Sequence, residues 1–152
     1  MTDEALMAAF EAGRPPDGGF HHEQHVRVAW NYLRAHPLPE ALGRFCGGLR
    51  RFASAQGADG LYHETITVAF VLLITERLAR AREDGALDTW DAFCAANPDL
   101  LAWKPSILDR YYTPGTLSSP RARRVFVMPD RGVPAPETRR DRPAAGATPS
   151  AP

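Results

Sequence analysis

Four of the five histidines lie in two short segments, and these segments carry the strongest chemical signal in the sequence. The first is FHHEQH at positions 20–25, and the second is LYHET at positions 61–65. Histidines three or four positions apart share one face of a helix, where neutral ring nitrogens can bind a metal ion together. The two segments therefore raise the question of whether their imidazoles meet at one site.

A divalent metal site is the first hypothesis for these side chains. On the helix expected for the first segment, His22 and His25 extend the apolar stripe toward the amino end, and His63 lies on an interior face of its own helix. Three imidazoles with an open fourth position are typical of catalytic zinc, and an added Glu64 carboxylate would suit iron or manganese. We therefore predict His22, His25 and His63 as metal ligands, with His21 as an alternate ligand.

Three further side chains are candidates for catalysis. Glu64 could act as a general base and Tyr62 could offer its phenol to the site, while Arg27 could clamp a substrate carboxylate or simply pair with Glu23. The H-E-x-x-H motif of metalloproteases is absent, because Val26 occupies the position of the required histidine. Protease chemistry is therefore set aside.

These residues predict a small metal-dependent enzyme with hydrolase or lyase chemistry on a small polar molecule. Two alternatives stay open. His63, Glu64 and His25 could transfer protons without a metal. The histidines could also be structural, since an imidazole at a helix amino end commonly bonds a carbonyl or a carboxylate, and the chain would then be a metal-free helical module that binds a partner protein. Residues 110–112 (RYY) could orient a substrate or close the end of the fold.

Hydrophobic periodicity predicts helices through most of the first 130 residues. The expected ranges are 3–12, 20–35, 39–57, 61–83, 88–96 and 106–112. The fourth is apolar nearly all round from Val68 to Ile74, so other helices should surround it. Gly47 and Gly48 fall inside the third, where they would permit close helix packing. Residues 125–128 should pack as an extended strap, and a further helical turn is expected near 119–124.

The chain length and composition fit one domain. The sequence has 152 residues, of which 44% are hydrophobic and 24% charged, as is typical of soluble globular proteins. From position 131 to 152 the sequence is rich in proline, alanine and arginine and nearly lacks large apolar side chains, so we expect a disordered tail. The expected fold is a single all-α bundle of five to six helices over residues 1–130, with an irregular carboxyl-terminal strap.

Charge and hydropathy exclude several classes of partner. The formal net charge is +0, whereas nucleic-acid-binding domains usually carry a basic excess. The longest apolar run, from Val68 to Ile74, is too short to span a membrane, and the acidic amino terminus does not resemble a signal peptide. Cys46 and Cys94 lack metal or redox spacing and indicate a reducing compartment. We therefore expect a cytoplasmic protein whose partner is a small molecule.

Overall fold

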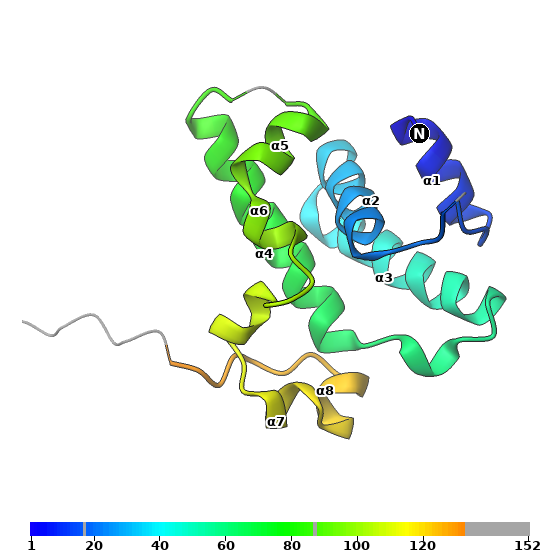
Figure 1. Ribbon diagram of the computed structural model, residues 1–152, viewed down its shortest axis with the longest axis vertical. Coiled ribbons are helices and arrows are strands. Elements are labelled where there is room, and N and C mark those ends of the chain that lie inside the picture. Colours follow the sequence, from blue (N-terminus) through cyan, green and yellow to red (C-terminus); the bar gives the residue numbers. More distant parts are fainter. Residues whose placement is uncertain (17, 87, 133–152) are drawn as a thin grey trace, which may run out of the picture.

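The computed structural model describes residues 1–16, 18–86 and 88–132, and this part of the chain is all-α (Figure 1). The α-helices are α1 (Asp3–Glu11), α2 (His22–Ala35), α3 (Leu38–Ala55), α4 (Glu64–Glu83), α5 (Trp90–Ala96), α6 (Pro98–Leu101), α7 (Pro114–Leu117) and α8 (Pro120–Arg124). Two 3₁₀ helices, η1 (Asp59–Leu61) and η2 (Ile107–Arg110), complete the described elements. The predicted all-α bundle is confirmed. The predicted tail lies outside the described residues from position 133 onward.

Local capping groups set where these helices begin and end. The Thr2 hydroxyl accepts a hydrogen bond from the Ala5 amide at the start of α1, and Gly13 takes a left-handed φ of 66° just after its end. Pro37 separates α2 from α3, as the sequence predicts. The start expected for the fifth helix was wrong. Thr89 caps α5, while Asp88 pairs with Arg34 at 2.8 Å.

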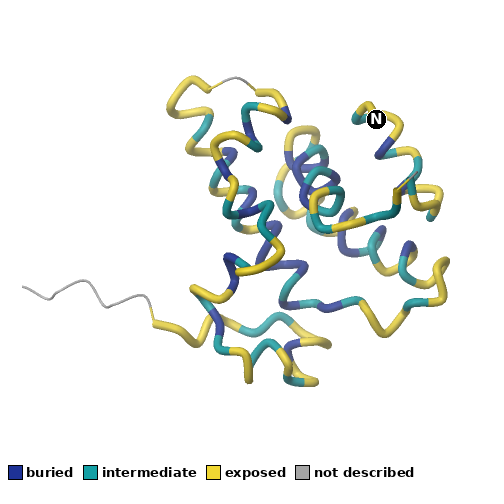
Figure 2. Tube along the Cα trace, in the orientation of Figure 1, coloured by how far each residue is buried: buried dark blue, intermediate teal, exposed yellow. Residues whose placement is uncertain are grey.

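The helix α4 lies at the centre of the fold, as its apolar sequence predicts. It packs against α2 and α3 along one side and against α8 near its amino end (Figure 1). Buried residues run along α2 and α4, whereas exposed residues gather on the connecting loops (Figure 2). The start expected at position 61 was too early, because η1 precedes α4 and His63 is the residue that caps it.

Phenylalanine rings hold α1 against α3. The ring of Phe10 stacks on those of Phe45 and Phe52, with centroids 6.1 and 5.9 Å away. A Cβ atom placed on Gly48 would lie only 2.5 Å from the Phe10 ring, so the helices could not approach this closely with a larger residue. The expectation that the glycine pair permits close packing is therefore correct for Gly48.

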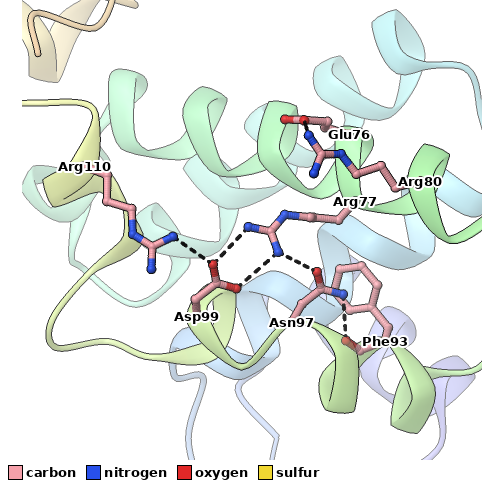
Figure 3. A network of polar contacts seen from close by, with 7 residues as sticks. All are labelled: Glu76, Arg77, Arg80, Phe93, Asn97, Asp99 and Arg110. Atoms are coloured by element: carbon pink, nitrogen blue, oxygen red, sulfur yellow. Dashed lines mark hydrogen bonds and ion pairs between the residues drawn. The ribbon is translucent and has the colours of Figure 1, made fainter. Parts of the chain in front are cut away.

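A polar network joins α4 to α5 and α6 (Figure 3). Arg77 donates to Asp99 at 2.9 Å and to the side-chain carbonyl of Asn97 at 3.0 Å. Asn97 in turn donates to the Phe93 carbonyl, and Arg110 reaches Asp99 at 3.2 Å. These fixed contacts position α6, which carries Leu100, and the segment after it, which carries Trp103.

The strap expected at residues 125–128 lies against the amino end of α4. The buried hydroxyl of Thr65 donates to the Val125 carbonyl at 2.8 Å and accepts from the Val127 amide at 3.0 Å. Tyr112 donates to the Val127 carbonyl at 2.9 Å, so a third element holds the same segment. None of the described helices has both the length and the apolar character needed to cross a membrane.

Candidate functional site

A cavity of about 790 Å³ lies between α2, α3 and α4. Its walls are mainly apolar. The lining residues include four phenylalanines: Phe20, Phe45, Phe52 and Phe70. Leu61 and Trp103 also line it, although they are 78% and 63% exposed, and they therefore mark its opening to solvent. The cavity thus joins the interior of the bundle to the surface.

All four histidines proposed as metal ligands line this cavity. His21, His22 and His25 come from the start of α2, and His63 comes from the start of α4. Because α2 packs against α4, two segments nearly forty positions apart reach the same space. Their ring nitrogens nevertheless differ in what they bond.

His63 uses both ring nitrogens within the protein. Its Nδ1 accepts a hydrogen bond from the Ile66 amide at 3.3 Å and so caps α4. Its Nε2 lies 2.8 Å from the Leu117 carbonyl, to which it donates. This pairing fixes the Nε2–H tautomer and leaves no lone pair for a metal.

His22 and His21 are each held through one ring nitrogen. The Nε2 of His22 donates to the Leu100 carbonyl at 2.8 Å, and the Nε2 of His21 lies 2.8 Å from the Gly18 carbonyl. The His22 ring also packs edge-on against Phe70. Burial lowers the pKa of His22, and the bond to Leu100 partly opposes that change. These contacts explain the orientation of both rings without a bound ion.

His25 differs from the other three. Its ring lies 4.4 Å from that of Phe20, and no hydrogen bond links either of its nitrogens to another described residue. Burial, together with the nearby imidazoles of His22 and His21, lowers its pKa to about 4. His25 is therefore a neutral imidazole at neutral pH, with one donor and one acceptor available to the cavity.

The donor set does not fit the predicted three-histidine metal site. Within residues 1–16, 18–86 and 88–132, no group of three or more His, Cys, Asp or Glu side chains is placed to hold a metal ion. The reason is visible at His63, where the lone pair that a metal would need accepts the Ile66 amide proton. The metal site stays a prediction from sequence that this geometry does not favour.

Glu64 lies outside the cavity wall, in a polar cluster beside it. Its carboxylate forms an ion pair with Arg50 and accepts a hydrogen bond from the Tyr62 hydroxyl at 2.6 Å. The Arg50 guanidinium also stacks over the Tyr62 ring, 4.5 Å from its centroid. Burial and the bond to Glu64 raise the pKa of Tyr62 well above its ordinary value. Tyr62 itself lines the cavity, but its hydroxyl is committed to Glu64.

Arg27 and residues 110–112 do not line the cavity. Arg27 pairs with Asp3 of α1 at 2.7 Å, rather than with Glu23 as one interpretation expected, and its guanidinium lies 5.5 Å from the Trp90 ring centroid. Arg110 belongs to the Asp99 network, and Tyr112 is buried beneath the strap. The interpretation of residues 110–112 as packing groups fits these contacts better than a role in substrate orientation.

Sequence reasoning missed Thr67 and the α3 wall as parts of a site. Thr67 is buried on α4 and lines the cavity, and no hydrogen bond joins its hydroxyl to another described residue. It comes four residues after His63, so the helical period already placed the two on one face. Phe45, Leu49 and Phe52 lie on the apolar face of α3, and part of that face borders the cavity.

Comparison with known proteins gives no guidance about this site. No family model matches the chain, no curated protein is significantly similar to it, and no solved structure matches it.

Proposed function

We propose that this protein binds a small, mainly apolar molecule in the cavity between α2, α3 and α4. The volume of about 790 Å³ lies within the range of roughly 300–1,000 Å³ that is typical of small-molecule sites. Such sites combine apolar walls with a few polar groups that orient the ligand. The observation that carries the proposal is the neutral His25 imidazole, which lines an apolar cavity without a hydrogen-bond partner among the described residues.

The His25 ring is partly buried, and its nitrogens are not among the fully buried polar atoms of the described residues, so they are open to the cavity. Helix capping explains His63 and carbonyl bonds explain His21 and His22, whereas His25 makes no hydrogen bond of this kind to any residue that the structure describes. A ligand that hydrogen-bonds to His25 would take the place of a water molecule at these nitrogens. The phenylalanine walls would meanwhile remove the apolar part of that ligand from water.

Binding is better supported than the hydrolase or lyase chemistry that the sequence suggests. A general base works best when its pKa lies near the operating pH, whereas that of His25 is lowered to about 4. Glu64, the other candidate base, is paired with Arg50. The mainly apolar walls also favour an apolar ligand over the small polar substrate expected from sequence. The free thiols of Cys46 and Cys94 support a reducing location such as the cytoplasm.

Titration with N-phenyl-1-naphthylamine, an uncharged apolar fluorophore, tests the proposal. We expect saturable binding at one site, with increased dye emission and a change in the emission of Trp103 at the cavity opening. Ala53→Phe on α3 would place a ring in the cavity and should weaken binding by at least about tenfold, or 1.4 kcal/mol.

Ser54→Phe is the matched control, because Ser54 is the next residue of the same helix, is exposed and does not line the cavity. Leu49→Trp provides a second blocking variant if Ala53→Phe lowers the melting temperature. Equal dye affinity in the blocking and control variants, or no saturable binding by the wild type, would rule out the proposed site.

A further inference from the structure

We infer that the molecule bound in this cavity is uncharged and carries a hydroxyl group that hydrogen-bonds to His25 and Thr67. This inference rests on the proposed binding function and specifies the chemical class of its ligand. It is carried by two observations about the walls: none of the described residues that line them is charged, and two polar side chains there, His25 and Thr67, make no hydrogen bond to another described residue.

The lack of charge among the described lining residues disfavours ionic ligands. None of the described residues that line the cavity is Asp, Glu, Lys or Arg. The ionic cluster at Tyr62 is already internally paired, since Glu64 binds Arg50 and the Tyr62 hydroxyl. A carboxylate or an ammonium group would therefore enter an apolar space without a counter-ion, which is strongly unfavourable.

The two unpartnered polar groups favour a hydroxyl. His25 comes from α2 and Thr67 from α4, so they approach the cavity from two helices that pack together. A neutral imidazole has one donor and one acceptor, and the threonine hydroxyl can both donate and accept. A ligand hydroxyl has the same two capacities and can satisfy both residues. A carboxylate can only accept, and an ammonium can only donate.

The walls also indicate the shape of the apolar part. Phe20 from the segment before α2, Phe45 and Phe52 from α3, and Phe70 from α4 present their rings to the cavity. The Phe20 ring lies 4.6 Å from that of Phe52 and 4.4 Å from that of His25, so the polar anchor lies directly beside an aromatic wall. Offset and edge contacts between rings make such a wall suitable for an aromatic ligand. A phenol-like molecule combines both features.

Four probes with the same ring system test the inference by calorimetric titration at pH 7: naphthalene, 2-naphthol, 2-naphthoate and 2-naphthylmethylammonium. We expect 2-naphthol to bind about tenfold more tightly than naphthalene, the gain from one good hydrogen-bonded group. The two charged probes should bind at least about tenfold more weakly than 2-naphthol.

Substitutions show whether the two residues produce this preference. In Thr67→Val, which keeps the side-chain shape, and in His25→Phe, the advantage of 2-naphthol over naphthalene should shrink while naphthalene still binds. Thr75→Val is the matched control, because the Thr75 hydroxyl bonds to the Val71 carbonyl on the same helix and does not line the cavity. If His25→Phe unfolds, Thr67→Val alone still gives the comparison.

The possible results separate this inference from the function on which it rests. Equal binding of all four probes, or a preference for 2-naphthoate, would overturn the inference while leaving the binding function intact. An undiminished preference for 2-naphthol in both variants would do the same. If neither naphthalene nor the fluorophore binds to the wild type, both proposals are wrong.

Discussion

The four clustered histidines acquire different roles because of where each ring stands relative to a helix start. The first amides of an α-helix have no partner within the helix, so a side chain just before the helix can accept hydrogen bonds from them. His63 meets this need for α4, and His21 precedes α2. His25, one turn into α2, is past that region, and its ring points to the cavity instead. The same residue type is therefore structural at the cap and available to a ligand one turn later.

The lowered pKa of His25 makes stability depend on pH. The unfolded chain takes up a proton near pH 6.5, whereas the folded chain resists protonation until about pH 4. Unfolding thus gains protons in that interval, and the free energy of unfolding falls as the pH drops from 7.5 to 4, by about 3 kcal/mol from this residue. His22, whose pKa is also lowered, acts in the same direction.

Urea denaturation across this pH range checks the prediction against His25→Leu, in which the titrating group is gone. Between pH 7.5 and 4, the free energy of unfolding of the variant should fall by about 3 kcal/mol less than that of the wild type. Parallel pH profiles for the two proteins would show that His25 is not held neutral by the fold.

His63 should contribute to stability through two separable bonds. His63→Ala removes the cap on the Ile66 amide and the tether to the Leu117 carbonyl, so we expect a loss of about 2–3 kcal/mol. His63→Asn retains a good capping side chain and should lose only about half of that. Denaturation midpoints measure the stability of both variants, and added zinc should change neither midpoint. Equal losses in the two variants would argue against the capping role.

At the scale of the element, side-chain size at one position sets how closely two helices approach. Gly47 and Gly48 are adjacent on α3, yet only Gly48 faces the Phe10 ring of α1. Sequence periodicity identified the stripe on which α3 packs, because apolar side chains recur every three or four residues. It did not identify the partner of the glycine pair, since that partner lies on a helix separated in sequence.

Matched substitutions at these glycines should therefore have opposite effects. Gly48→Ala places a Cβ 2.5 Å from the Phe10 ring and should destabilise the fold by about 1–3 kcal/mol. Gly47→Ala meets only an Arg51 guanidinium atom at 3.4 Å, so the higher helix propensity of alanine should stabilise by up to about 1 kcal/mol. Thermal unfolding of both variants measures the difference, and a stabilising Gly48→Ala would contradict the packing described.

At the scale of the whole molecule, the cavity depends on three helices that different contacts hold in place. The phenylalanine cluster fixes α3 against α1, and the Arg77–Asp99 network fixes α4 against α6. Leu100 and Leu117, which accept the bonds from His22 and His63, lie on segments that these and the strap contacts position. The orientation of the histidines is thus a property of the assembled fold.

A ligand that contacts α2, α3 and α4 together should stabilise the molecule as a unit. At a free concentration one hundred times its dissociation constant, 2-naphthol should add about 2.7 kcal/mol to the free energy of unfolding. Differential scanning calorimetry should show one shifted transition in the wild type and a much smaller shift in Ala53→Phe. An equal shift in both proteins would place the ligand elsewhere.

The sequence by itself determined the helical fold and the central position of α4, because these follow from local periodicity and capping. It also placed the two histidine segments at the starts of two helices. Tertiary structure alone decided which ring nitrogens are already bonded. The acceptors for His22 and His63 lie 78 and 54 positions away along the chain, and no local pattern specifies such partners. For the same reason, only the packed helices could show that His25 lines an apolar cavity without a hydrogen bond to any other residue in the described part of the chain.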